Sequence, residues 1–242
     1  MNYLLILIFA LRAVDCTIPS TFRKCGRKNP DFQKCLQEAA QNAVQQLAKP
    51  FKSLNLPSLE PLIVESLTLE RAPGAVSVEQ QLTNCKLSGL TSAKIEKYDM
   101  NFDNKTVALV AVIPEGVLKC EYKMDGQILV LTVKGEGNAT IGCKNLRCVY
   151  HAGYKDYVKN NKTYFMVDND VLDAEPEEVY INFENLFGGN KEVGDNINKV
   201  LNENAKEIYE ERKPVYNDLM KQVVTEVLNR VFAKVSIEEA FE

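Results

Sequence analysis

The stretch KEVGDNINKVLNENAKEIYEERKPVYNDLMKQVVTEVLNRVFAKV, residues 191–235, decides the fold, and we interpret residues 190–235 as one very long amphipathic helix. A helix of about 44 residues is roughly 66 Å long, whereas a compact globule of this chain length is on the order of 45 Å across. The helix should therefore bend, or the molecule should be elongated along it. Pro214 lacks a backbone N–H and predicts a kink within the helix.

One face of this helix is apolar at helical spacing, and Lys, Glu, Asp and Asn fill most of the remaining positions. Such a long apolar stripe is stable only where something of similar length covers it. The stripe consists of Val193, Ile197, Val200, Leu201, Ala205, Ile208, Tyr209, Val215, Leu219, Val223, Val227, Val231 and Val235.

The segments that precede the helix are mostly strand-like. The dipeptide Asp125-Gly126 favours a tight hairpin turn between two of them. No helical pattern separates the strands, so we expect an antiparallel, meandering sheet. The expected strands are 76–90, 95–101, 106–114, 117–124, 127–135, 137–154, 163–171 and 178–185.

Two segments, VALVAVI (107–113) and ILVLTV (128–133), are apolar at consecutive positions. An antiparallel strand with one wet face should alternate between apolar and polar residues. We therefore expect these segments to be covered on both faces, or to line something apolar. This pattern predicts a sheet that curls around its contents.

The N-terminus predicts a secreted protein. The apolar run within residues 1–16 is typical of a signal peptide, with cleavage after Cys16, and residues 17–242 would form one domain. Three sequons, at Asn104, Asn138 and Asn161, predict N-glycosylation. Loss of Cys16 with the signal peptide leaves an even number of cysteines, which suits disulfides in an oxidising compartment.

A second helix is expected over residues 29–49, with Asn29 as its N-cap and Pro50 as its end. A Cys25–Cys35 disulfide would tie the preceding segment to this helix and contribute roughly 2–3 kcal/mol. The other cysteines, Cys85, Cys120, Cys143 and Cys148, allow three pairings, and the sequence does not choose among them.

The composition and motifs indicate no enzyme, no metal site and no cofactor. A net charge of −4 argues against nucleic acid and anionic membranes as partners, and after the N-terminus no apolar run is long enough to span a membrane. The single histidine, His151, lies three residues from Cys148, so within one strand the two side chains point to opposite faces. The acidic stretch 168–178 lacks the glycine and spacing of a calcium loop.

The residues resemble, over essentially the whole mature chain, the takeout and juvenile-hormone-binding family of secreted insect proteins. No single motif is decisive, but their order and spacing together are specific. The resemblance rests on Cys25…Cys35, Pro57-Ser-Leu-Glu-Pro61, Leu87-Ser-Gly89-Leu90, Tyr122-x3-Gly126 followed by 128–133, Asn182-Phe-Glu-Asn-Leu-Phe-Gly188, Val193-Gly-Asp-x-Ile-Asn198, Leu201-Asn-Glu-Asn204 and Lys213-Pro214.

The resemblance implies an α+β fold in which a strongly curved antiparallel sheet wraps a long C-terminal helix, similar to bactericidal-permeability and lipid-transfer proteins. It also implies a carrier of a small hydrophobic ligand, such as an isoprenoid hormone, a terpenoid or a fatty acyl compound, in an internal tunnel. The chain departs from the family pattern at Ala205, where Trp is frequent, and at Cys120, where Gly is frequent. We therefore expect a ligand class broader than juvenile hormone itself.

We predict a monomeric, extracellular, non-catalytic carrier, without stable membrane insertion, whose inward-facing apolar side chains form the ligand wall. Two alternatives stay open: a salivary or haemolymph protein that acts through its surface or a receptor, and a secreted hydrolase that uses His151. The candidate ligand-binding residues are Leu62, Val64, Val78, Leu82, Leu109, Leu118, Tyr122, Leu129, Leu131, Ile141, Leu146, Ile181, Phe183, Phe187, Ile197 and Leu201.

Overall fold

The computed structural model describes residues 18–71 and 73–241, and the predicted signal peptide lies outside these residues. Among them, no helix is both long enough and apolar enough to cross a membrane. The helices are α1 (Phe32–Gln46), α2 (Lys191–Glu203), α3 (Ala205–Phe232) and α4 (Ile237–Phe241). The strands are β1 (Leu62–Leu69), β2 (Val76–Ser88), β3 (Lys94–Asn101), β4 (Thr106–Ile128), β5 (Leu131–Lys159), β6 (Lys162–Glu175) and β7 (Glu178–Phe183).

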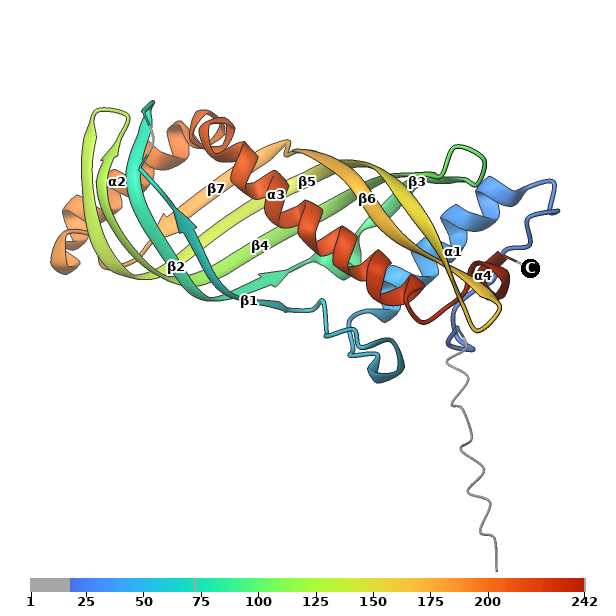
Figure 1. The fold of residues 1–242 in the computed structure, drawn as a ribbon. Coiled ribbons are helices and arrows are strands. Elements are labelled where there is room, and N and C mark those ends of the chain that lie inside the picture. The colour runs from blue at the N-terminus through green and yellow to red at the C-terminus, as the bar shows by residue number, and fades with distance from the viewer. Residues whose placement is uncertain (1–17, 72, 242) are drawn as a thin grey trace, which may run out of the picture.

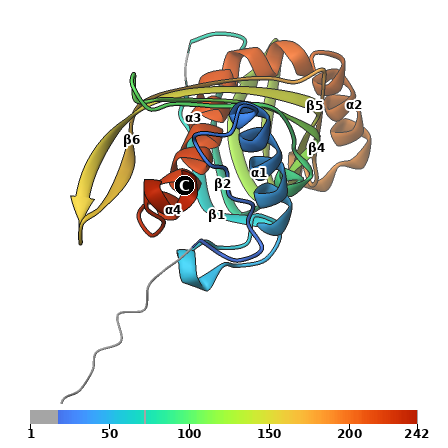
Figure 2. The ribbon, with the colours of Figure 1, turned by 90° about the vertical axis from the view of Figure 1, so that its right-hand side faces the viewer.

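The strands form one antiparallel sheet in the order β1-β2-β4-β5-β6, with β3 paired to β4 and β7 paired to β5. The long strands β4 and β5 form its centre, and the molecule is elongated along them (Figure 1). Seen from the end that carries α1 and α4, the sheet curves over α3 and α1 (Figure 2). The expected fold, a curved antiparallel sheet around a long C-terminal helix, is confirmed.

The expected hairpin turn at Asp125-Gly126 is wrong. Strand β4 continues through both residues, through Pro114 and on to Ile128, so segments predicted as separate strands are one strand. Gly126 pairs with Val78 of β2, and a Cβ at Gly126 would lie 2.6 Å from the Val78 Cα. The glycine is therefore needed for the close approach of β2 rather than for a turn.

The actual β4–β5 turn falls inside the apolar segment 128–133, at Leu129 and Val130. Leu129 has a positive φ of 54°, and Val130 is 87 % exposed. The expectation that this segment is covered on both faces is therefore wrong. In the other apolar segment, 107–113, every residue is buried or half-buried, as the sequence predicts.

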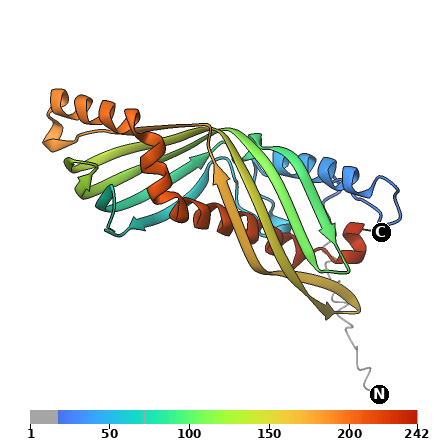
Figure 3. The same cartoon turned by 90° about the horizontal axis from the view of Figure 1, so that it is seen from above.

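The long C-terminal helix is interrupted at Asn204, and α3 continues through Pro214. The side chain of Asn204 donates a hydrogen bond to the Val200 carbonyl, and its backbone N–H bonds the same carbonyl. Asparagine competes with the helix through such local bonds, so it can end one helix and begin the next. In Figure 3, α2 and α3 follow one another along the length of the molecule.

The helices are joined to the edge strands β6 and β7 by asparagine side chains rather than by apolar packing alone. Asn198 exchanges two hydrogen bonds with the backbone of Phe183, both 2.9 Å long. Asn202 likewise exchanges two with the backbone of Ile181, which are 2.9 and 2.6 Å long. Asn217 and Asn229 of α3 accept hydrogen bonds from backbone N–H groups of β6. These amides act as partners that a further strand would otherwise supply.

At the other edge of the sheet, Arg212 of α3 supplies hydrogen-bond donors to the backbone of β2. Strand β1 pairs with β2 only from Gln80 onward, so the first residues of β2 lack a partner on that side. The Arg212 guanidinium donates hydrogen bonds to the carbonyls of Val76 and Val78, and to that of Glu70 just after β1. Helix α3 therefore spans the opening between the two edges of the sheet.

Helix α1 begins at Phe32 rather than at Asn29, because Asn29 accepts a hydrogen bond from Asp31 N–H and forms a turn first. Two glutamines of α1, Gln37 and Gln41, bond the backbone of β3 around Ile95 and so hold the helix against that strand. Disulfides join Cys25 to Cys35 at the start of α1, and Cys85 of β2 to Cys120 of β4.

Candidate functional site: an apolar cavity along the long helix

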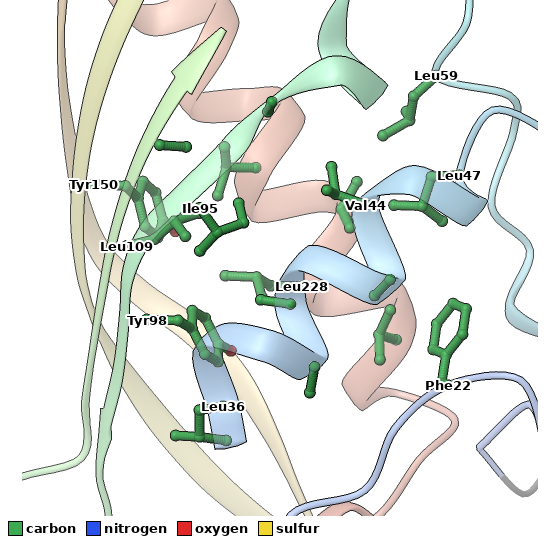
Figure 4. A pocket seen from close by; sticks show the side chains of 18 of the residues that line it. Phe22, Leu36, Val44, Leu47, Leu59, Ile95, Tyr98, Leu109, Tyr150 and Leu228 are labelled. Carbon is green, nitrogen blue, oxygen red and sulfur yellow. The ribbon is translucent and has the colours of Figure 1, made fainter. Parts of the chain in front are cut away.

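A cavity of about 250 Å³ lies between α1, α3 and the inner face of strands β3 to β6 (Figure 4). Almost all of its lining side chains are apolar. On the strand side, Leu109, Ala111 and Ile113 of β4 alternate inward, which explains why segment 107–113 is apolar on both faces. The segment therefore lines a space on one face.

The two helices line the cavity with different kinds of side chain. Helix α3 supplies large aliphatic residues at spacings of three and four, which place them on one face. Helix α1 supplies mainly alanines at its centre, and these small side chains leave space that larger ones would fill. The helical lining residues are Leu36, Ala39, Ala40, Ala43, Val44 and Leu47 of α1, and Met220, Val223, Val224, Val227, Leu228, Val231 and Phe232 of α3.

One end of the cavity is covered by segments from both ends of the described chain. Phe22, Cys25 and Phe241 line it there. Backbone hydrogen bonds from Cys25 N–H to the Ala240 carbonyl, and from Arg27 N–H to the Phe241 carbonyl, hold α4 in place. The Phe241 ring also packs against the rings of three phenylalanines, Phe32, Phe102 and Phe232.

A second, smaller cavity of about 70 Å³ adjoins the first along α3. Leu90, Ile113 and Met220 line both spaces, so they lie between the two, and we call these three residues the neck. The second cavity is otherwise lined by residues such as Leu118, Tyr209 and Tyr216. The two apolar cavities thus follow one another along α3.

The polar groups of the main cavity are few, and most already have partners. Thr225 donates to the Asp170 carboxylate, so its oxygen accepts the hydrogen bond from the Tyr150 hydroxyl at 2.9 Å. Arg23 pairs with Glu38 at 2.5 Å. Burial raises the pKa of the Tyr150 hydroxyl to about 12, so at neutral pH this group is an uncharged phenol.

Two cysteines outside the disulfides face the cavities. Cys148 lines the main cavity and Cys143 lines the smaller one. Burial raises the pKa of the Cys148 thiol to about 12 and raises that of Cys143 as well. Both are therefore protonated at neutral pH, which disfavours nucleophilic chemistry. His151 is exposed and lies on the opposite face of β5 from Cys148.

The structure brings together only four of the predicted ligand-binding residues around these cavities. Leu109 lines the main cavity, and Leu118, Ile141 and Leu146 line the smaller one. The remaining twelve lie elsewhere. Buried residues that line neither cavity are Val78, Leu82, Tyr122, Ile181, Phe183 and Leu201; Leu62, Val64, Leu129, Leu131 and Ile197 are half-buried, and Phe187 is 37 % exposed.

Phe187 lines a larger groove of about 920 Å³ at the other end of the sheet. Charged side chains, including Lys123, Asp125, Lys134 and Glu136, also line that groove. An apolar ligand would leave these charges without water, which is unfavourable. The groove is therefore a poor site for such a ligand despite its size.

Sequence reasoning missed the contribution of α1 and of the C-terminal half of α3. The signal was present, because Val223, Val227 and Val231 belong to the apolar stripe. Ala39 and Ala43 are four residues apart in the helix expected over residues 29–49, so they share one of its faces. The stripe extends over both α2 and α3. Only the three-dimensional structure shows which part of the stripe lines a cavity and which part packs against other side chains.

Comparison with known proteins identifies the family of the chain. The family model for haemolymph juvenile hormone binding protein matches residues 4–242. The circadian clock-controlled protein daywake of Drosophila melanogaster is 22% identical over 232 residues, covering 93% of this chain and 88% of that protein. The "Putative beta-carotene-binding protein" of Schistocerca gregaria is 21% identical over 215 residues, covering 88% and 85%.

The fold also has a solved counterpart. The crystal structure of Epiphyas postvittana Takeout 1 matches with a TM-score of 0.81 at 22% identity, covering 91% of this chain and 99% of that one. This likeness concerns the fold, whereas the family model matches nearly the full sequence. The chain belongs to the haemolymph juvenile hormone binding protein family.

Proposed function

We propose that the protein is an extracellular, non-catalytic carrier that holds a small hydrophobic ligand in the cavity between α1 and α3. The observation that carries this proposal is the apolar space itself, about 250 Å³ lined almost wholly by aliphatic and aromatic side chains. An engineered apolar cavity of only about 150 Å³ already binds benzene. The neck to the second cavity adds room for an elongated molecule.

The driving force for binding is the transfer of the ligand's apolar surface out of water. A ligand that buries about 300 Å² of apolar surface gains roughly 7 kcal/mol from that transfer, before the cost of association. The name of the Schistocerca gregaria relative, which refers to beta-carotene, is consistent with a hydrophobic ligand. Isoprenoids, terpenoids and fatty acyl compounds all belong to this class.

Secretion and glycosylation are part of the proposal. The sequon residues Asn104, Asn138 and Asn161 all have exposed side chains, and Asn104 and Asn161 lie in turns between strands. Two disulfides suit an oxidising compartment. Analysis of secreted material from insect cells, with and without glycosidase, tests this part.

The direct test of the carrier function is native mass spectrometry of protein secreted from insect cells, beside a solvent-extracted sample. We expect a discrete added mass that disappears on extraction and a fluorescent hydrophobic probe that binds the extracted protein. An extracted protein that binds no hydrophobic probe would refute the proposal and favour a function of the outer surface.

A pair of variants on α1 locates the site. Ala43 lines the cavity, whereas Gln45 is exposed on the other side of the same helix. Ala43→Phe should fill the space and weaken probe binding at least tenfold, while Gln45→Phe should leave it unchanged. Equal affinities for the two variants would show that ligands bind elsewhere.

A further inference from the structure

One polar group of the main cavity has no partner, the hydroxyl of Tyr98 on β3. Within residues 18–71 and 73–241 it makes no hydrogen bond, although the hydroxyls of Tyr122, Tyr150 and Tyr154 each make one. In Figure 4 the Tyr98 ring extends away from the strand, and its oxygen points inward, toward α1. The side chain is half-buried rather than fully enclosed, so a molecule in the cavity can reach the hydroxyl and supply the missing hydrogen bond.

The other polar groups of the cavity cannot take the place of Tyr98 as a donor. The proton of Tyr150 is used toward Thr225, whose own proton goes to Asp170. The guanidinium of Arg23 pairs with Glu38 through one nitrogen, and its side chain is 52 % exposed, so its other N–H groups are open to water. The Cys148 thiol is only a weak donor. Tyr98 is therefore the strong neutral hydrogen-bond donor in the described lining that has no partner.

We propose that Tyr98 is the polar anchor of the cavity and that the ligand is a neutral, elongated molecule whose oxygen acceptor bonds to the Tyr98 hydroxyl. This inference rests on the proposed carrier function. The acceptor would be the carbonyl oxygen of an ester, ketone or aldehyde, or the hydroxyl oxygen of an alcohol. The apolar remainder would occupy the space between α1 and α3 and reach the neck at Met220.

The same lining disfavours an ionised head group. The cavity holds no unpaired cation among the described residues, because its one charged side chain, Arg23, is already paired. A carboxylate placed beside Tyr98 would lose its hydration without gaining an opposite charge. Burial also raises the pKa of the Tyr98 hydroxyl, so at neutral pH the group stays a neutral donor.

The test compares three probes of similar chain length that differ in their head group. Methyl laurate carries a neutral acceptor, laurate carries a charge, and tridecane carries neither. Each competes with N-phenylnaphthylamine on the native protein, on Tyr98→Phe and on Tyr157→Phe, a control on the outer part of β5 where the ring is 39 % exposed. The affinity of each variant for the fluorescent probe itself is measured first.

We expect Tyr98→Phe to weaken methyl laurate about five- to tenfold, because one hydrogen bond is lost. Tridecane should bind that variant as it binds the native protein, and Tyr157→Phe should change neither affinity. On the native protein, laurate at neutral pH should bind more weakly than methyl laurate. Because the Tyr98 hydroxyl makes no bond in the described structure, Tyr98→Phe should also melt no lower than the native protein.

Three outcomes would overturn the anchor. One is an unchanged methyl laurate affinity in Tyr98→Phe; the second is an equal loss for methyl laurate and tridecane, which would mean a packing role. The third is a selective loss of methyl laurate affinity for Tyr216→Phe instead, since Tyr216 lines the second cavity and its hydroxyl makes no hydrogen bond in the described part of the chain. The carrier function itself fails only if no probe binds the native protein.

Discussion

The buried side chain of Arg212 gives the sharpest test of how the helix closes the sheet. It is 7 % exposed, and its guanidinium bonds three backbone carbonyls and no carboxylate among the described residues. Two of those carbonyls belong to Val76 and Val78, where β2 has lost β1 as a partner. Replacement by methionine keeps an unbranched apolar stem but removes the guanidinium and all its donors.

The expected cost follows from the groups that remain. Each buried carbonyl without a donor costs about 1–3 kcal/mol, so Val76 and Val78 together lose roughly 2–6 kcal/mol. Removal of the guanidinium recovers part of this, because its Nε has no partner and its charge is buried. We expect a net loss of about 3 kcal/mol for Arg212→Met, and about half of that for Arg212→Lys, which keeps the charge but not the fork.

Urea unfolding followed by far-UV circular dichroism measures this loss. For a slope of about 3 kcal/mol per molar urea, the midpoint of Arg212→Met should fall by roughly 1 M. Arg147→Met is the control, because Arg147 is half exposed and pairs with Glu96 at the surface. A loss below about 1 kcal/mol for Arg212→Met, or equal losses for the two variants, would refute the role of Arg212 as a substitute for the missing strand.

Three further predictions concern the cavities, the tyrosines and the second disulfide. Met220→Ala should widen the neck, so in a competition series of methyl esters the variant should bind tightly esters that are several carbons longer than those that the native protein binds. An unchanged preference for chain length would contradict the role of Met220 between the two cavities. Burial raises the pKa of Tyr150 and Tyr216 to about 12. In the unfolded chain tyrosines ionise near pH 10, whereas Tyr150 and Tyr216 of the folded protein stay protonated to about pH 12. The contribution of the two tyrosines to the free energy of unfolding should therefore be full below about pH 10 and should decrease as the pH rises toward 12. Urea unfolding at stepped pH measures this, and a flat profile would argue against their burial. The Cys85–Cys120 disulfide closes a loop with a sequence separation of 35. Its removal in the double variant Cys85→Ala/Cys120→Ala should lower the free energy of unfolding by roughly 4 kcal/mol. A thermal midpoint equal to that of the native protein would contradict this.

The sequence predicts the elements of this fold better than their ends. Helical periodicity in residues 190–235 identifies the long helix, and the absence of helical patterns between strands identifies the antiparallel sheet. The turn preference of Asp125-Gly126 is misleading, because the glycine is required by the close approach of strand β2 and not by a reversal of the chain. Contacts that are distant in sequence decide such positions, and a local pattern does not contain them.

The site is less predictable than the fold for a related reason. The sequence pattern of an inward-facing leucine is the same whether its side chain packs against other side chains or lines a cavity. Leu82, which is buried in the core, and Leu109, which lines the main cavity, therefore cannot be distinguished from the sequence. The difference arises from how far α1 and α3 stand from the sheet. That separation depends on polar contacts such as those of Gln41 and Asn229 with strand backbones, whose partners no local pattern predicts.

The asparagine bonds of α2 and α3 have a consequence for how such proteins diverge. Asn198, Asn202 and Asn229 bond to N–H and C=O groups of the strands, which nearly every amino acid possesses. Asn217 accepts from a strand N–H in the same way and also donates to the Asp173 carboxylate. The strand residues at those contacts can therefore change without loss of the junction. A lineage can vary the inner wall residue by residue while its architecture persists, which fits a fold shared at a TM-score of 0.81 by chains only 22% identical.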